Sequence, residues 1–84
     1  MFKAVISVNF KKSILDPQGN AVLKALNSLG YQNVEDVRIG KHIEVMLDCE
    51  NKDKAKEQLN EMCDKLLANP VIEDYQVEVV EVGR

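Results

Sequence analysis

The sequence has few of the residues on which small enzymes and secreted domains depend. Its 84 residues include no tryptophan, two cysteines (Cys49 and Cys63) and a single histidine, His42, and aromatic residues make up 5% of the chain. Secreted domains this short often carry several disulfides, so two cysteines on apolar faces favour buried thiols in a reducing compartment. No Cys-x-x-Cys occurs, and one histidine cannot complete a zinc site at the usual ligand spacing. We therefore expect no metal site.

The sequence also lacks a basic excess and a long apolar run. Its 11 lysines and arginines are outnumbered by 14 acidic residues, the net charge is −3, and Arg38 is the one internal arginine. Nucleic-acid-binding domains usually carry a basic stripe, so no nucleic-acid partner is expected. The apolar residues between Phe2 and Phe10 alternate with others, and this run is too short for a signal peptide or a membrane span. A cytoplasmic protein with no membrane partner is predicted.

Residue patterns that could support catalysis are scarce. Nucleophilic catalysis needs a nucleophile, a base and a group that orients the base, and Ser13 has no base nearby in the sequence. The adjacent acids Glu35-Asp36 and Glu73-Asp74 would point to opposite faces of a strand, so neither pair forms an acid–base dyad. Gly40-Lys41 lacks the glycine-rich lead-in of a phosphate loop and the Ser or Thr that follows it. We predict no catalytic residue and no cofactor bound by this chain.

The residues that are present describe one small domain over residues 1–84. Apolar residues make up 45% and charged residues 30% of the chain, which is a globular profile. Alternation between residues 2 and 10 predicts a strand whose even-numbered side chains face the core. Asp16 and Pro17 suit the cap and first position of a helix, and Gly30 suits its left-handed end, so a helix is predicted from Pro17 to Leu29.

The second half of the chain repeats this pattern. Two strands, over residues 36–39 and 43–49, are predicted to form a hairpin around Gly40-Lys41, with an odd-numbered turn or a bulge that keeps the large apolar side chains on one face. A second helix is predicted to open at Asn51 and to end at Pro70. A last strand is predicted over residues 71–82. The expected apolar stripe of the second helix comprises Ala55, Leu59, Met62, Cys63, Leu66 and Leu67.

The order β-α-β-β-α-β predicts an α+β fold, the ferredoxin-like βαββαβ sandwich, with two helices on one face of a four-stranded antiparallel sheet. A domain of this size buries only about 60–65% of its unfolded surface, so a partner surface would help it. The other face of the sheet is expected to be either solvated or an interface between copies of the chain. Its predicted residues are Val5, Ser7, Asn9, Arg38, His42, Glu44, Met46, Gln76, Glu78 and Val80.

Three segments in this order and spacing resemble a known family over essentially the full length of the chain. They are Leu15-Asp16-Pro17-Gln18-Gly19, then Asp36-Val37-Arg38-Ile39-Gly40-Lys41, then the run from Met62 to Tyr75. The chain resembles the PurS family, the small subunits of phosphoribosylformylglycinamidine synthase. Each motif alone is weak, and the three in register are specific.

The resemblance implies a subunit without catalytic residues, in an enzyme of purine biosynthesis. That enzyme converts formylglycinamide ribonucleotide into the amidine with ATP and with ammonia from glutamine. A large synthetase subunit uses ATP and magnesium, and a glutaminase subunit makes the ammonia. The small subunit bridges the two and assists ammonia transfer. PurS-like chains are homo-oligomers, either a dimer or a dimer of dimers, and such a scaffold contributes by holding reactive centres in position.

Four residues are hypothesised to contact the partner subunits: Arg38, Lys41, Asn69 and Glu73. Arginine is favoured at interface hot spots, and three of these four residues lie in the segments that carry the resemblance, at predicted exposed or turn positions. Asp16-Pro17 and Gly19 are interpreted as a helix start only.

Two other functions stay open from the sequence. The first is a small-molecule-binding regulatory module of the same fold. The second is a stand-alone enzyme such as an acylphosphatase-like hydrolase, although the loop of residues 11–15 lacks the arginine that acylphosphatases use.

Overall fold

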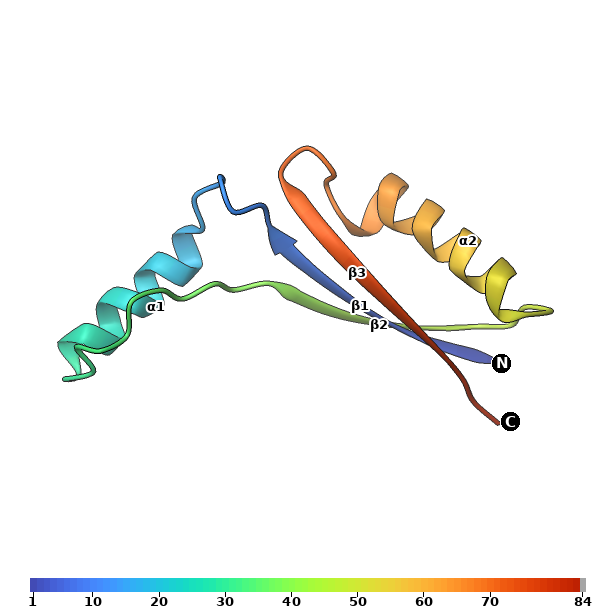
Figure 1. Cartoon of the computed structure of the whole chain (residues 1–84), viewed down its shortest axis with the longest axis horizontal. Helices are drawn as coiled ribbons and strands as arrows, with labels where there is room; N and C mark the ends of the chain where they lie inside the picture. Colours follow the sequence, from blue (N-terminus) through green and yellow to red (C-terminus); the bar gives the residue numbers. More distant parts are fainter. Residues whose placement is uncertain (84) are drawn as a thin grey trace.

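The computed structural model describes residues 1–83 and contains one sheet, two α-helices and a short π-helical turn (Figure 1). The molecule is elongated, with extents of 51 × 29 × 15 Å. Its elements in chain order are β1 (Phe2–Phe10), α1 (Pro17–Ser28), β2 (Lys41–Leu47), α2 (Lys52–Met62), the turn η1 (Cys63–Leu67) and β3 (Glu73–Glu81).

The sheet has three antiparallel strands in the order β2-β1-β3. Val8 of β1 lies opposite Lys41 of β2 and Tyr75 of β3. Even-numbered residues of β1 therefore share a face with odd-numbered residues of β2 and β3, as the alternation predicted. The opposite face, which we call the open face, carries the strand residues that were predicted for it: Val5, Ser7, Asn9, His42, Glu44, Met46, Gln76, Glu78 and Val80. Arg38 was also predicted there, but it lies outside the strands.

The core lies between this sheet and α2, which packs mainly against β3 and β1. Ile6, Val8 and Leu59 are fully enclosed there, and Cys63 lies beside them as a free thiol, as predicted. Cys49 is also free and half-buried, and it packs against the same cluster.

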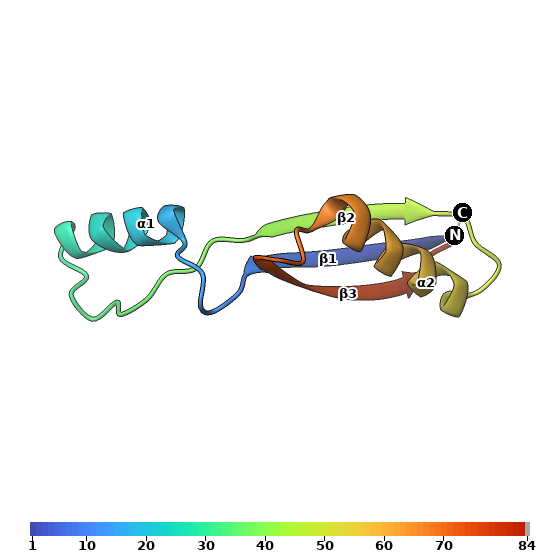
Figure 2. The same cartoon turned by 90° about the horizontal axis from the view of Figure 1, so that it is seen from above.

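The first helix does not cover the sheet, which corrects the predicted sandwich. α1 lies beyond the end of the strands, and residues 29–40 return beside it as an extended segment that continues straight into β2 (Figures 1 and 2). The predicted hairpin around Gly40-Lys41 is therefore wrong, because residues 36–39 belong to no strand and the chain does not reverse there. The four-stranded ferredoxin-like fold is not formed by the described residues of one chain. We call residues 13–39, α1 with its two flanking segments, the arm.

Leu66 was predicted as a core residue and is 83% exposed. The turn η1 explains this change, because the Ala68 amide donates to the Cys63 carbonyl across five residues instead of four. The wider turn places Ala68 in the core, where it is buried, and rotates Leu66 toward solvent.

Candidate functional site

The four residues hypothesised to contact partners lie at one end of the sheet, where the arm begins. Lys41 opens β2 and Glu73 opens β3, so both flank the last residues of β1. Asn69 lies in the turn before β3, and Arg38 lies in the segment that leads into β2. The structure thus brings together residues that are up to 35 positions apart, from Arg38 to Glu73.

Glu73 is the centre of a small hydrogen-bonded cluster. Its carboxylate is 9% exposed, accepts the Asn69 amide at 2.8 Å and faces the Lys41 ammonium at 3.5 Å. The Asn69 carbonyl accepts the amides of Ile72 and Glu73, and its side-chain oxygen accepts the Val71 amide. Asn69 and Glu73 therefore fix the turn into β3. Lys41, whose side chain is 59% exposed, keeps most of its surface available for another molecule.

Arg38 joins the arm to the sheet. One guanidinium nitrogen, Nη2, donates to the Phe10 carbonyl at 3.1 Å and to the Lys11 carbonyl at 3.0 Å. These carbonyls lie where β1 ends. The guanidinium remains exposed, so Arg38 has a structural contact and also a free surface.

Asp16 does more than start a helix, which the sequence interpretation missed. Its side chain is 4% exposed; one oxygen accepts the Gly19 amide at 2.9 Å and the other accepts the Ile39 amide at 2.7 Å. These two hydrogen bonds, in that order of effect, hold the pKa of Asp16 below its ordinary value. The carboxylate thus links α1 to the returning segment of the arm.

Two glycines permit the close approaches at this site. A Cβ on Gly19 would lie 2.2 Å from the Val37 carbonyl oxygen, and a Cβ on Gly40 would lie 2.4 Å from the Val8 carbonyl oxygen. Gly19 allows α1 to touch the returning segment, and Gly40 allows that segment to pass against β1. Each glycine lies in one of the segments that carry the family resemblance, which was the available sequence signal.

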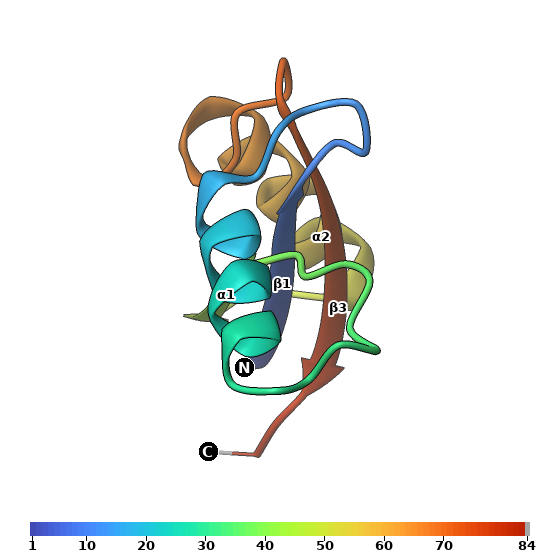
Figure 3. The ribbon, with the colours of Figure 1, turned by 90° about the vertical axis from the view of Figure 1, so that its left-hand side faces the viewer.

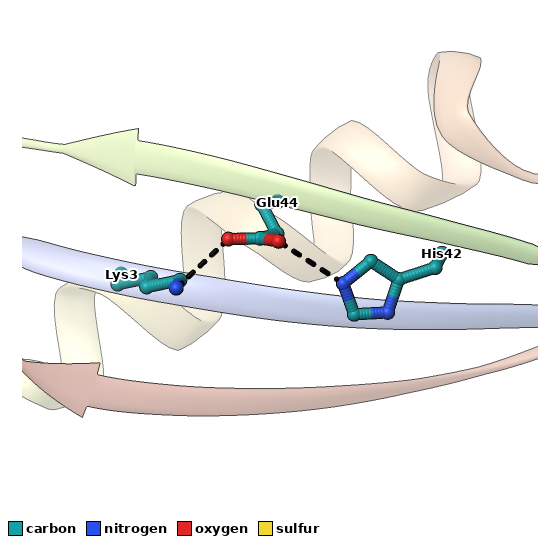
Figure 4. Close-up of polar contacts among 3 residues, drawn as sticks. All are labelled: Lys3, His42 and Glu44. Carbon is teal, nitrogen blue, oxygen red and sulfur yellow. Dashed lines mark hydrogen bonds and ion pairs between the residues drawn. The ribbon is translucent and has the colours of Figure 1, made fainter.

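The open face of the sheet carries a polar contact that the sequence did not single out. Glu44 accepts from Lys3 at 2.8 Å and lies 3.2 Å from the His42 ring nitrogen Nε2 (Figure 4). Hydrogen bonds with Lys3 and then His42 lower the pKa of Glu44. All three side chains are substantially exposed, so we interpret the contact as a solvated surface pairing.

Two further titratable side chains, Cys63 and Tyr75, have raised pKa values. Burial raises the pKa of the Cys63 thiol, and a hydrogen bond to Asp64 raises the pKa of Tyr75. No group of three or more metal-ligating side chains occurs within residues 1–83. Over the same residues, neither α-helix is long and apolar enough to cross a membrane.

Comparison with known proteins gives a consistent result. Residues 3–81 match the family model described as PurS, phosphoribosylformylglycinamidine (FGAM) synthase. The chain is 45% identical over 82 residues to the phosphoribosylformylglycinamidine synthase subunit PurS of Methanocaldococcus jannaschii, covering 98% of this chain and 99% of that protein.

Solved structures agree with the sequence matches. The crystal structure of Bacillus subtilis PurS superposes with a TM-score of 0.88 at 51% identity, over 96% of this chain and 100% of that chain. A chain from the structure of PurLQS from Thermotoga maritima gives a TM-score of 0.85 at 35% identity, over 94% of this chain and 96% of that chain.

Proposed function

The chain belongs to the PurS family of phosphoribosylformylglycinamidine synthase subunits, which act in purine biosynthesis, and we propose that it bridges the synthetase and glutaminase subunits of that enzyme and assists ammonia transfer. The Thermotoga relative has been solved in a PurLQS assembly, which supports a bridging role. The observation that carries the proposal is the arm, which exposes large apolar side chains and does not pack on the sheet of its own chain (Figure 1).

We further propose that two copies complete each other's sheets, as a dimer or as one half of a dimer of dimers. The arm exposes large apolar side chains, namely Leu15 at 73%, Leu29 at 75%, Tyr31 at 56% and Val22 at 38%. Seen from the arm end, α1 stands in front of the strands (Figure 3). Exposed apolar surface of this kind gains stability when a second surface covers it.

A complementary surface supports this pairing. On the helix-bearing face of the sheet, Ile43 and Val45 of β2 are only partly buried, since α2 packs mainly against β3 and β1. Placing α1 of a second copy over β2 would cover this strip. The extended residues 35–40 of that copy would supply the missing fourth strand, and the ferredoxin-like sandwich would then form between two chains.

The four hypothesised contact residues keep their proposed role in a revised form. Lys41 and Arg38 are exposed cations at the junction, and we propose that they meet acidic groups of the partner subunits. We propose that Asn69 and Glu73 act by holding the turn that precedes β3.

The chemistry is proposed to reside in the partners. ATP and magnesium are expected on the large subunit, and the expected location is the cytoplasm. The chain's own contribution would then be the relative position of two active centres.

The test is glutamine-dependent ADP formation by the large and glutaminase subunits, with and without this chain. Ammonia in place of glutamine serves as the control for the synthetase reaction itself. Turnover with glutamine only when the chain is present would support the bridge. Equal rates without the chain would exclude it, and a ligand that raises the melting temperature of the chain would then favour the regulatory module.

The pairing is tested separately by sedimentation velocity over a range of chain concentrations. A dimer or tetramer that dissociates on dilution would support the pairing. A monomer at every concentration would exclude it without affecting the bridging test.

A further inference from the structure

We infer that Arg38 is a tether that fixes the direction of the arm relative to the sheet, and that it keeps the arm from folding back onto its own sheet. The inference deepens the proposed pairing and rests on it. The contacts at the junction are of two kinds: those within the arm, and those between the arm and the end of the sheet.

The contacts within the arm make it a rigid unit. Asp16 joins the start of α1 to the Ile39 amide, and Gly19 lies against the Val37 carbonyl. The Tyr31 amide donates to the Leu26 carbonyl and closes the far end of the unit. None of these contacts involves a strand, so all of them would survive a rotation of the whole arm.

Other contacts at the junction involve residues outside the arm: those of Arg38, that of Gly40, and the hydrogen bond from the Ile14 amide to the Lys11 carbonyl within the turn after β1. The two hydrogen bonds of Arg38 end on carbonyls of residues 10 and 11, outside the arm. A charged donor shared by two carbonyls is a stronger contact than a neutral hydrogen bond. Gly40 lies against Val8 and Asn9 and marks the point about which the segment would turn.

An alternative position for the arm is available within one chain. Val37 and Ile39 alternate with polar residues in the same way as Ile43 and Val45, and a reversal at Gly40 would pair these two segments. α1 could then cover Ile43 and Val45 of its own β2. Exchange of an element between copies competes with such closure, and the hinge decides between the two. Arg38 holds the arm extended and therefore favours exchange.

The arm direction can be measured with two spin labels on the full chain. The labels are attached through the substitutions Ser28→Cys and Lys52→Cys. Ser28 ends α1, Lys52 begins α2, and both are exposed. These two helix ends lie at opposite ends of the molecule (Figure 1). Cys49→Ser removes the half-buried thiol, and Cys63 is enclosed. The labelled chain is mixed with an excess of unlabelled chain. The distances measured by pulsed electron paramagnetic resonance are then those between two labels on the same molecule.

With Arg38 in place, the distances between the two labels should form one narrow distribution at a long distance. Arg38→Ala should broaden the distribution and add shorter distances, and it should weaken self-association about three- to tenfold in sedimentation, the scale of one or two exposed charged hydrogen bonds. Arg38→Lys should restore the long distance in part, because an ammonium also donates to carbonyls. Lys24→Ala, an exposed cation on α1, is the matched control and should change nothing.

A distance distribution for Arg38→Ala equal to that of Lys24→Ala would overturn the tether. Far-UV circular dichroism checks that both variants are folded. If the chain proves monomeric while Arg38→Ala still shortens the label distance, the pairing fails and the tether stands. The experiment therefore distinguishes a failure of the pairing from a failure of the Arg38 contact to direct the arm.

Discussion

At the scale of single residues, Asp16 shows how one side chain can hold two segments together. It occupies the cap position that the sequence predicted and accepts the Gly19 amide. Its second oxygen accepts the Ile39 amide, 23 residues further along. The cap was predictable because its partner lies in the same turn, whereas the second hydrogen bond depends on the path of residues 29–40, which no local pattern determines.

The two hydrogen bonds to Asp16 predict a specific pH dependence. Because the pKa of the folded carboxyl is lowered from 3.8, the stabilisation is fully present above that value and is lost as the pH falls through the lowered pKa. Asp16→Asn can still cap α1 but offers only one acceptor oxygen. We expect it to lower the melting temperature by about 5 °C at pH 7.

The difference between wild type and Asp16→Asn should shrink as the pH falls from 3.8 through the lowered pKa of the folded Asp16 carboxyl, where the aspartate becomes protonated. Thermal melts from pH 2.5 to 7, at one protein concentration, check this. Glu44 and Glu61 also have lowered pKa values, and their contribution cancels in the comparison because both proteins carry them. A difference that stays constant across the range would exclude the charged Asp16 link.

Gly19 gives a second test at the residue scale. A Cβ at this position would lie 2.2 Å from the Val37 backbone oxygen, so Gly19→Ala must push α1 away from the returning segment. We expect a loss of about 10 °C or more in melting temperature. Gly83→Ala is the control, because a Cβ there meets nothing within 4 Å, and it should change the melting temperature by less than about 2 °C. Similar melts for the two variants would contradict the close packing.

At the scale of elements, helix α2 and the turn η1 that follows it show that apolar residues at helical spacing are not all buried. Leu59 is fully buried, and Leu66, seven residues later, is 83% exposed. Leu59→Ala should reduce the free energy of unfolding by about 2–5 kcal/mol. Leu66→Ala should change it by less than about 0.5 kcal/mol. Urea denaturation measures both, and equal losses would show that the turn η1 does not rotate Leu66 out of the core.

The elements themselves were largely predictable, and their packing was less so. Alternation located β1, and a capping residue with a proline located α1 within one residue of its observed end. Leu66 was assigned to the core because the prediction assumed a regular helix, and a single widened turn shifts every later side chain. The predicted hairpin failed for another reason. The alternation at Val37 and Ile39 describes a segment fit for a sheet, and it does not specify which chain supplies the neighbouring strand.

At the scale of the whole molecule, the candidate site lies at the junction between the sheet and the arm, and the arm contains the segment that was predicted as the fourth strand. Arg38, Lys41 and Glu73 were proposed from motif membership, and the structure places them at the junction from which the arm projects. Arg38 and Glu73 hydrogen-bond to backbone groups there, and Lys41 pairs with Glu73. Lys41 and Arg38 also keep exposed surface, which stays accessible to other subunits.

The proposed pairing makes a prediction for backbone hydrogen exchange. Residues 35–38 lie in no strand of the described chain, so their amides should exchange quickly in dilute solution. When a second copy pairs with this segment, these amides should become protected in proportion to the paired fraction. Amides of β1, which lies between two strands within one chain, should be protected at every concentration.

Exchange measured by mass spectrometry on peptides from residues 32–40 and 2–10, over a hundredfold or so range of concentration, distinguishes pairing through the segment from pairing elsewhere. A chain that dimerises through the open face of the sheet would leave the segment 35–38 unprotected at high concentration. Protection of the segment even in dilute solution would instead mean that the arm has folded back on its own sheet. The same measurement on Arg38→Ala then separates these cases, since loss of the tether should shift protection of the segment toward low concentration.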